Sequence, residues 1–371
     1  MDVDNLNIAI VGAGYAGAAA AKALSLAGAT VNVYEQATEI HEVGAGIGLR
    51  PSSLDQFRHW GILGDIEKVT SPSESFEIVT PTGQRIAEEK WPEADTYGLT
   101  TRFVHRGDFI DTLVGVLPQG MVHTGHKLQH IVDNGDSATI EFENGKTVTA
   151  DLVIGADGIR SQVRYQLFSR QEPVFAGEHA YRAVIDASAT HGLPYDDKLR
   201  MYIGHGTKIY FLPLLHRNQV SFDVTALNAD STPAPQMTKD DLLATIEGFD
   251  ERILATVRDL DMSTVNIRAV YDIDPVDVWH SNAVALIGDA AHAMCHHQGQ
   301  GANSAILDAG VLAECLTEAG SVAEALAQYQ ATRKPMTDEL QRVSRHGWTE
   351  DELDDVFPGQ KPGQSASTTR A

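Results

Sequence analysis

Three glycines, Gly12, Gly14 and Gly17, constrain the fold of this 371-residue chain more than any other feature. They follow a short apolar stretch, residues 6–11, and lead into an alanine-rich stretch, residues 18–26. A strand, a glycine turn and a helix in that order are typical of a βαβ unit in a parallel α/β sheet. The first glycine permits the tight turn, the second lets the backbone approach a pyrophosphate, and the third lets the helix pack on the strand. The spacing therefore predicts a dinucleotide site.

The second predicted strand, residues 31–35, ends in an acidic side chain. Glu35 is placed to accept hydrogen bonds from a ribose, while the N-terminus of the preceding helix offers N–H groups and a positive dipole to the phosphates. This pattern alone does not choose between FAD and NAD, and a purely structural glycine turn is the alternative to both.

Two later apolar stretches resemble the first strand. Residues 151–157 and 283–289 each end in an aspartate that lies beside a glycine. Open α/β sheets place their ligands at the carboxyl ends of the strands, so Asp157 and Asp289 are predicted to face the same ligand. Apolar residues then recur at helical spacing over 302–316, which predicts an amphipathic helix.

The middle of the chain has a different pattern, with aromatic stretches separated by charged and Gly- or Asn-rich turns. It predicts a mostly antiparallel sheet inserted between parts of the first domain. The fold class is therefore α/β, a Rossmann-like domain interleaved with a mostly antiparallel sheet domain. The expected segments are 1–70, 100–175 and 276–345 for the first domain, 71–99 and 176–275 for the sheet domain, and 346–371 for a C-terminal extension with a disordered end.

Composition limits the partners. The 28 Lys and Arg residues against 51 Asp and Glu residues give a net charge of −23. This balance argues against nucleic acid or an anionic membrane as a partner. The two cysteines, Cys295 and Cys315, are too few for a disulfide framework and favour a reducing compartment. The apolar run over 8–21 is too short to span a bilayer and lacks a positively charged segment before it, so a cytoplasmic location is predicted.

The glycine pattern, the Asp157-Gly158 pair and the Gly-Asp-Ala-Ala-His run that begins at Gly288 occur in this order. The set resembles the group A FAD-dependent aromatic monooxygenases, in particular the salicylate hydroxylase and 6-hydroxynicotinate 3-monooxygenase branch, over about residues 6–345. The resemblance implies an FAD-binding domain of the p-hydroxybenzoate hydroxylase type. It also implies NADH or NADPH as a transient donor and O2 as co-substrate. A small phenolic or hydroxy-N-heteroaromatic acid would be hydroxylated through a C4a-hydroperoxyflavin, with or without decarboxylation.

Several flavin contacts follow from this resemblance. Glu35 would hold the adenosine ribose, Arg106 would lie beside the ribityl chain and pyrophosphate, and Asp289 would bind the ribityl chain. The loop over 44–48 matches the glycine loop that lets the flavin ring swing between two positions. The implied cofactor-binding residues are Gly12, Gly14, Ala16, Gly17, Glu35, Gln36, Gly46, Arg106, Asp157, Gly158, Asp289, Gly299, Gly301, Ala302 and Asn303.

The chain departs from the family where a proline usually follows the Gly-Asp-Ala-Ala-His run. His296 stands at that position without the fixed φ of proline, and His297 matches a histidine common in the branch. A histidine that titrates near ~6.5 can accept or relay the proton of a ring hydroxyl. We expect His297 and Tyr210 to be catalytic, with His296 and His205 as further candidates. The expected substrate contacts are Arg50, Arg182, Tyr202, Phe211 and Phe222.

Other interpretations stay open at this stage. The two adjacent histidines could be loop residues bonded to backbone or solvent, and no metal site is expected, because no carboxylate lies at ligand spacing. The alternative functions are an FAD reductase or dehydrogenase that does not activate oxygen, an NAD-dependent dehydrogenase, and a non-catalytic FAD-binding module. The protein is expected to be a monomer or a homodimer. Because FAD, NAD(P)H and an acid substrate are all anionic, we expect an acidic exterior around a locally basic cleft, formed by arginines 50, 106, 160, 164 and 182.

Overall fold

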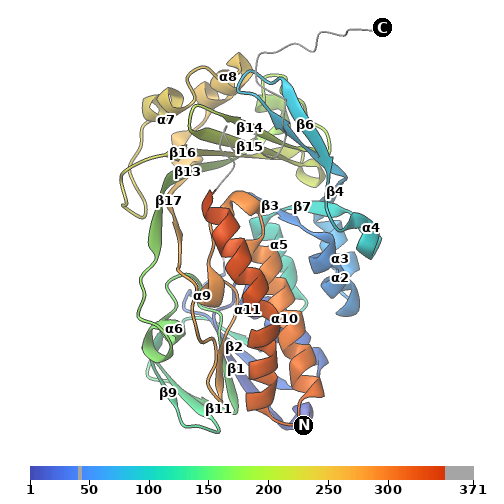
Figure 1. The fold of residues 1–371 in the computed structure, drawn as a ribbon, viewed down its shortest axis with the longest axis vertical. Helices are drawn as coiled ribbons and strands as arrows, with labels where there is room; N and C mark the ends of the chain where they lie inside the picture. Colours follow the sequence, from blue (N-terminus) through green and yellow to red (C-terminus); the bar gives the residue numbers. More distant parts are fainter. Residues whose placement is uncertain (41–43, 347–371) are drawn as a thin grey trace.

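The protein is described from a computed structural model, which covers residues 1–40 and 44–346. The molecule is elongated, with a parallel sheet in one half and a large antiparallel sheet in the other (Figure 1). The predicted C-terminal extension lies outside the described residues, except for residue 346, at which α11 ends. None of the helices in the described part of the chain combines the length and the apolar character needed to cross a bilayer.

A five-stranded parallel sheet forms the first half, in the order β18-β12-β1-β2-β8. Its core strands are short runs of β-branched and other apolar residues that are buried on both faces, as expected for a parallel sheet covered by helices. The strands are β1 (Asn7–Val11), β2 (Thr30–Tyr34), β8 (Val122–His123), β12 (Leu152–Gly155) and β18 (Val284–Leu286).

Helices surround this sheet. Helix α1 (Tyr15–Leu26) packs on α10 (Gly301–Glu318), and α10 packs on α11 (Val322–His346), the two long helices drawn in orange and red in Figure 1. The remaining helices of this half are α2 (Pro51–His59), α3 (Leu63–Lys68), α4 (Ala94–Tyr97), α5 (Arg106–Gly115), α6 (Gln162–Leu167) and α9 (Asp289–His292). The short 3-10 helix η5 (His296–Gln298) lies between α9 and α10.

Two three-stranded sheets accompany the parallel sheet. One, in the order β3-β7-β4, consists of β3 (Gly46–Leu49), β7 (Thr101–His105) and β4 (Thr70–Ser73). The other, in the order β11-β10-β9, consists of β11 (Thr147–Ala150), β10 (Ala138–Phe142) and β9 (Leu128–Asp133). The sequence predicts neither sheet; the strands of the second are only four to six residues long and mix apolar with polar residues.

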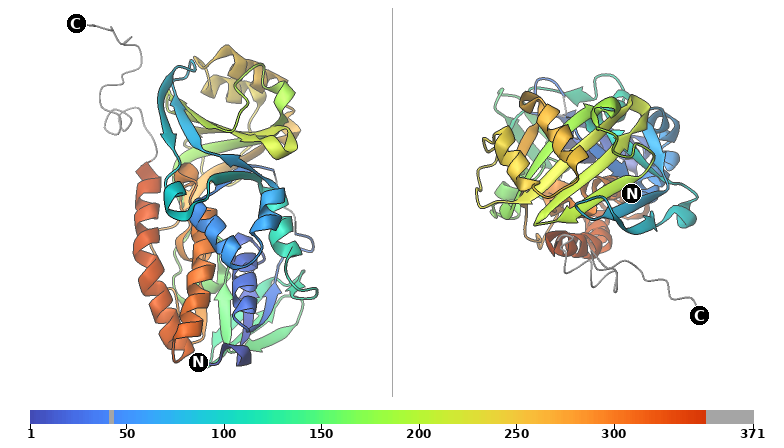
Figure 2. Two further views of the ribbon diagram at one scale, coloured as in Figure 1. Left: turned by 90° about the vertical axis from the view of Figure 1, so that its right-hand side faces the viewer. Right: turned by 90° about the horizontal axis from the view of Figure 1, so that it is seen from above.

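A seven-stranded sheet in the order β17-β13-β16-β15-β14-β5-β6 forms the second half. All its neighbours pair antiparallel except β14 and β5, which run parallel. Figure 2 shows it from two further sides, with helices on its outer face. The strands are β17 (Asn266–Asp272), β13 (Val174–Asp186), β16 (Gln219–Leu227), β15 (Thr207–Leu214), β14 (Leu199–Gly204), β5 (Ser75–Val79) and β6 (Arg85–Lys90).

The two faces of this sheet have different neighbours, because successive side chains of a strand point to opposite sides. The outer face packs against α7 (Lys239–Thr245) and α8 (Glu251–Asp259) in an apolar core that includes Tyr181, Phe211 and Phe222. The inner face carries Tyr210 and several charged residues, and it meets η5 and β3 of the parallel-sheet half. The inner face is therefore the side of this sheet whose polar side chains meet the parallel-sheet half.

Candidate active site

The glycine turn after β1 has the geometry that its spacing predicts. Gly12 has a φ of +103°, a backbone conformation that side chains rarely adopt. A Cβ there would overlap the carbonyl oxygen of Ala156, and a Cβ at Gly17 would overlap the carbonyl oxygen of Gly12. These approaches bring the turn against the end of β12 and seat α1 on β1. Helix α1 begins after Gly14, where the open side of the turn offers its N-terminal N–H groups.

Glu35 lies beside this turn, one residue beyond β2. Its Oε2 accepts a hydrogen bond of 2.8 Å from the backbone N–H of Ala13, and its Oε1 accepts one of 2.8 Å from the N–H of Ala37. The carboxylate therefore fixes the turn. Each oxygen has a further lone pair, so the same group can still accept a hydrogen bond from a ribose.

Asp157 lies in the loop between β12 and α6, and Arg106 is the first residue of α5. The carboxylate of Asp157 accepts hydrogen bonds from the backbone N–H groups of Gln162 (2.6 Å) and Val163 (3.1 Å) at the first turn of α6. Burial raises the pKa of Asp157, and these hydrogen bonds work against that rise. Arg106 begins α5, and its Nε donates to the hydroxyl of Tyr15 over 3.0 Å. Asp157 thus has a structural task in addition to any contact with a cofactor.

Asp289 begins α9 and is solvent-exposed, although Gly288 and Ala290 on either side are buried. Surrounding protein atoms nevertheless raise the pKa of its carboxyl by desolvation, against the lowering effect of His292 and Arg106. A carboxyl that is accessible to solvent and yet partly desolvated is enclosed by protein on several sides. Asp289 is therefore reachable from solvent at the carboxyl end of β18.

Asp308 of α10 holds the backbone on either side of Asp289. Its Oδ2 accepts hydrogen bonds from the N–H of Gly288 (2.9 Å) and from Nε2 of His292 (2.6 Å), and its Oδ1 accepts one from Nε of Arg333 (2.8 Å). Burial alone would raise the pKa of Asp308, but His292 and Arg333 lower it to about 2. Sequence reasoning missed this buried anchor, although an aspartate on the apolar face of an amphipathic helix is a signal for it.

Asn303 joins the glycine loop to α10. Its Oδ1 accepts hydrogen bonds of 2.8 Å from the N–H of Arg50 and from the hydroxyl of Ser53, and its Nδ2 donates to the carbonyls of Gly48 and Gly299. The side chain of Asn303 therefore hydrogen-bonds to three segments at once: the start of α2, the end of β3 and the end of η5.

Gly46 of β3 touches the inner face of the seven-stranded sheet. Its N–H donates to the hydroxyl of Ser221 over 2.7 Å. A Cβ at this position would lie 2.6 Å from a methyl group of Leu212. Only glycine lets the loop approach the sheet this closely, so the two halves of the molecule meet at Gly46.

Four polar residues form a continuous chain on the inner face beside η5. The hydroxyl of Tyr210 lies 3.2 Å from Nδ1 of His297. Nε2 of the same ring lies 2.7 Å from Oε2 of Glu178, whose Oε1 accepts a 2.9 Å hydrogen bond from Nζ of Lys208. The side chains of His297, Glu178 and Lys208 are 3%, 10% and 11% exposed. Sequence reasoning singled out Tyr210 and His297 but missed Glu178 and Lys208.

A second set of contacts continues across this face. Nε2 of His296 lies 2.9 Å from the hydroxyl of Thr225, which donates to Asp223, and Asp223 accepts a 2.7 Å hydrogen bond from Nε of Arg182. Burial, with the positive charge of Arg182, lowers the pKa of His296 well below its usual value, so this ring is neutral. The expectation of a locally basic cleft is wrong for this face, because Glu178 and Asp223 lie beside the histidines, each paired with a cation.

Comparison with known proteins decides the class of this site. A family model described as an FAD binding domain matches residues 5–344. The 6-hydroxynicotinate 3-monooxygenase of Pseudomonas fluorescens is 32% identical over 350 residues, which cover 91% of this chain and 90% of that protein. The chain belongs to the FAD-dependent aromatic monooxygenases. The salicylate hydroxylase of Pseudomonas putida is also 32% identical, over 380 residues, covering 94% of this monooxygenase and 86% of that enzyme.

Solved structures confirm the predicted fold class of this monooxygenase. A substrate complex of salicylate hydroxylase superposes with a TM-score of 0.78 at 26% identity, covering 98% of this chain and 91% of that one. HpxO of Klebsiella pneumoniae, in complex with FAD and uric acid, has a TM-score of 0.83 at 23% identity, covering 95% and 89%.

The residues expected at the FAD of this monooxygenase fit such a group. A Cβ added at Gly14, Gly158 or Gly299 would meet no atom within 4 Å, so the backbone there faces open space. Arg106 and the N-terminus of α1 supply positive charge to phosphates. Gln36 is exposed beside Glu35, and Ala16, Gly301 and Ala302 lie in the first turns of α1 and α10, the helices that flank this space.

Several expected substrate contacts of this monooxygenase lie apart from His297. Tyr202, Phe211 and Phe222 are buried in the outer-face core under α7 and α8. His205 is exposed at the turn between β14 and β15, where its ring meets Phe249. Only Arg182, of the expected substrate contacts on the sheet, shares the inner face with His297.

Three other arginines take separate positions. The guanidinium of Arg50 lies over Trp91, 4.2 Å from the ring centroid. Arg160 lies over Tyr271, and Arg164 is buried and donates to the carbonyl of Ala290 over 2.9 Å. Arg164 therefore supports α9 from below.

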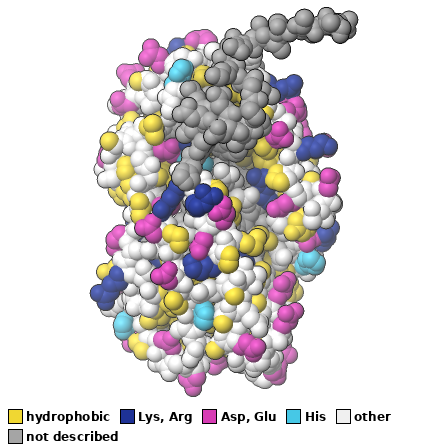
Figure 3. Space-filling view, viewed as in Figure 1, with side chains coloured by type: hydrophobic (Ala, Val, Ile, Leu, Met, Phe, Trp, Pro, Cys, Tyr) yellow, Lys and Arg dark blue, Asp and Glu magenta, His cyan; other side chains and the backbone are white. Residues whose placement is uncertain are grey.

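Figure 3 shows acidic side chains spread over one face of the molecule from end to end, as a net charge of −23 requires.

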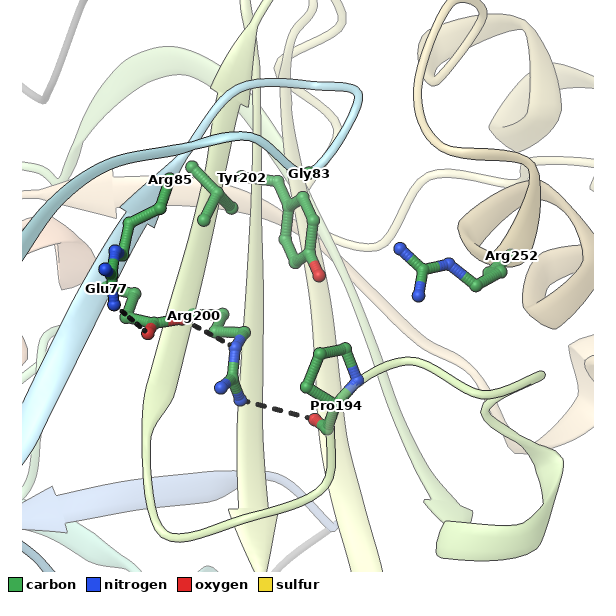
Figure 4. Close-up of a pocket in the computed structure, with 8 residues that line it drawn as sticks. Glu77, Gly83, Arg85, Pro194, Arg200, Tyr202 and Arg252 are labelled. Carbon is green, nitrogen blue, oxygen red and sulfur yellow. Dashed lines mark hydrogen bonds and ion pairs between the residues drawn. The ribbon is translucent and has the colours of Figure 1, made fainter.

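A cavity of about 190 Å³ lies on the outer side of the large sheet, lined by three arginines, Glu77 and Tyr202 (Figure 4). Its arginines are already paired. Arg200 contacts Glu77 (2.8 Å) and Asp196 (2.7 Å), and Arg252 contacts Asp250 (2.6 Å). With its cations neutralised in this way, the cavity offers no net charge to an anion.

Within residues 1–40 and 44–346, no group of three or more His, Cys, Asp or Glu side chains could hold a metal.

Proposed function

We propose that this monooxygenase uses NAD(P)H and O2 to hydroxylate a small aromatic acid that carries a ring hydroxyl. The relatives point to this class, because 6-hydroxynicotinate, salicylate and 3-amino-4-hydroxybenzoate each combine a hydroxyl with a carboxylate on one ring. Bound FAD supplies the redox chemistry, namely electron transfer from NAD(P)H to O2 and insertion of one oxygen atom into the ring. The pairing of Tyr210 with His297 on the inner face is the observation that carries the proposal.

Ring activation is the task of these two residues. A hydroxyl-bearing ring becomes more electron-rich when its proton leaves, and a free phenol near pKa ~10 is about three units from neutral pH, worth roughly 4 kcal/mol. Burial raises the pKa of Tyr210, and the charges of Asp223 and Glu178 raise it further, so this phenol stays protonated. Its hydroxyl donates to Nδ1 of His297, and its oxygen is then oriented to accept the proton of the substrate.

Arg50 is the proposed partner of the substrate carboxylate. Its Nη1 is buried and makes no hydrogen bond to any described residue, whereas the guanidinium is held over Trp91. Burial lowers the pKa of Arg50 to about 10, against the effect of Glu93, so the group is still a cation at neutral pH. A desolvated cation with a spare N–H is suited to a carboxylate.

The proposal is tested with the purified flavoprotein and a panel of hydroxylated benzoates and pyridine carboxylates. We expect an acid of this class to stimulate NAD(P)H oxidation and O2 uptake together, and to gain the mass of one oxygen atom, with or without loss of its carboxylate. Substrate-dependent turnover without O2 uptake would instead indicate a reductase or dehydrogenase. Bound FAD with no stimulation by any acid would favour a non-catalytic flavin-binding module.

A further inference from the structure

Glu178 and Lys208 form a buried ion pair behind His297, on two non-adjacent strands of the large sheet. Glu178 lies on β13 and Lys208 on β15, with β16 between them. Burying two charges costs several kcal/mol each before their attraction is counted, so a pair of this kind is weak evidence for a role in stability alone. Its position is more informative, because the second carboxylate oxygen faces the ring of His297.

The arrangement gives the two ring nitrogens of His297 different partners. Oε2 of Glu178 lies 2.7 Å from Nε2, and the hydroxyl of Tyr210 lies 3.2 Å from Nδ1. Burial would raise the pKa of Glu178, but His297 and Lys208 lower it, so the carboxylate is ionised. A carboxylate only accepts hydrogen bonds, so Nε2, the ring nitrogen that lies 2.7 Å from it, is the nitrogen that carries a proton. Nδ1 is left as the acceptor for Tyr210.

We propose that Glu178, held by Lys208, is a positioning residue that keeps His297 in the Nε2–H tautomer and stabilises the imidazolium formed when a substrate hydroxyl is deprotonated. This inference rests on the proposed function. The protons balance within the chain: the substrate O–H bond breaks and its proton passes to the oxygen of Tyr210, while the Tyr210 proton passes to Nδ1 of His297. The electron pair stays on the substrate oxygen, which becomes a phenolate.

Charge supports the same assignment. Before transfer, the charges of Glu178 and Lys208 cancel, and the form of His297 that can accept a proton adds no charge. After transfer, the imidazolium lies between the carboxylate of Glu178 and the new phenolate. Further charged or titratable groups near this ring, within the described part of the chain, are Arg182 on β13, Asp223 on β16, neutral His296 on η5 and the buried thiol of Cys295. Arg182 and Asp223 are paired with each other, which leaves Glu178 as the carboxylate that meets His297 directly.

The test uses Glu178→Gln, which keeps the size of the side chain and removes its charge. Glu77→Gln is the matched control, because Glu77 is a buried carboxylate of the same sheet that pairs with Arg200 at 2.8 Å, away from His297. With the best acid of the panel, we expect kcat of Glu178→Gln to fall about 10- to 100-fold with little change in KM. The control is expected to keep wild-type kcat.

A second readout needs no turnover. A nitro-substituted hydroxybenzoate, whose phenolate absorbs visible light, is bound to each holoprotein and titrated with pH. We expect its ionisation to move at least about one pH unit higher in Glu178→Gln than in the wild type and in Glu77→Gln, a change of about tenfold in the ionisation constant. An unshifted titration together with wild-type kcat would overturn the role of Glu178.

Glu178→Asp separates positioning from simple structural support, because it keeps the charge and shortens the side chain. We expect its phenol titration to lie near that of the wild type. Equal shifts in Glu178→Asp and Glu178→Gln, or equal loss of bound flavin in both, would mean that the residue only supports the fold, which contradicts the inference. If the wild type hydroxylates no acid, the proposed function fails, whereas the phenol titration still decides the effect of Glu178 on the bound phenol.

Discussion

The hydroxyl of Tyr210 lies 3.2 Å from Nδ1 of His297, although the two residues are 87 positions apart and belong to different halves of the molecule. One comes from the inner face of the large sheet and the other from the 3-10 helix that follows α9. The contact therefore exists only when the two halves are docked as they are here, and the predictions below follow from that docking.

Replacing His297 by alanine removes the acceptor for the Tyr210 proton. We expect hydroxylation by His297→Ala to fall at least about 100-fold, the range attributed to general acid–base groups. Because the substrate is then less activated, a larger share of the consumed NAD(P)H is expected to yield hydrogen peroxide. Product formation and peroxide are measured in the same assay. Wild-type hydroxylation without raised peroxide would remove His297 from the mechanism.

Replacing Gly12 by alanine tests the glycine turn. The new Cβ would overlap the carbonyl of Ala156 at a φ of +103°, so the turn must shift away from the pyrophosphate position. We expect Gly12→Ala to be purified with much less FAD than the wild type, as read from its visible absorbance. Gly64→Ala is the control, since a Cβ there meets no atom within 4 Å. Equal FAD content in the two variants would contradict this assignment.

Asp308→Asn should weaken the backbone under Asp289. The change leaves Arg333 buried without its carboxylate, and losing one partner of a buried pair typically costs about 3–5 kcal/mol. Because the pKa of Asp308 is lowered to about 2, its contribution is complete above about pH 4 and is lost as pH falls toward 2. Urea denaturation at pH 7 measures the cost. Asp338→Asn, at the partly exposed pair with Lys334, should cost less than about 1 kcal/mol.

The burial of His296 leads us to expect that the folded protein loses stability in mild acid. Its pKa in the folded protein is well below the usual value, whereas the unfolded chain takes up this proton near ~6.5. The unfolded state therefore binds more protons below that pH, and stability falls as the pH is lowered. We expect His296→Gln to reduce the fall in melting temperature between pH 7 and pH 5.5. His59→Gln, at an exposed position, is the control, and equal slopes in both variants would refute the prediction.

Much of the FAD-binding half could be predicted from the sequence, because its signals are local. The strand–turn–helix order predicts where Gly12 and Glu35 lie, and the structure has the glycine turn at that place. Asp308 and Glu178 could not be found in this way. Each acts through partners that lie far away in the sequence, Arg333 for the first and Lys208 and His297 for the second.

The sheet shows a second limit of sequence reasoning. Alternation along β14, β15 and β16 correctly indicates two faces, but nothing local tells which face meets the other half of the molecule. The sequence therefore does not separate Tyr202, Phe211 and Phe222 from Tyr210, whereas the structure places these three in the core under α7 and α8. Their aromatic rings pack against α7 and α8, the helices within residues 239–259, and this contact cannot be seen from the strand sequences alone.

The central claim is that Tyr210 and His297 serve oxygen insertion into an aromatic acid, and isotopically labelled O2 tests it most directly. The wild-type flavoprotein, NAD(P)H and the best acid of the panel are incubated under labelled O2, and the product is analysed by mass spectrometry. We predict one labelled oxygen atom in each product molecule, with the yield per NAD(P)H strongly reduced in Tyr210→Phe and His297→Ala. A product without label, or an unchanged yield in both variants, would contradict the account.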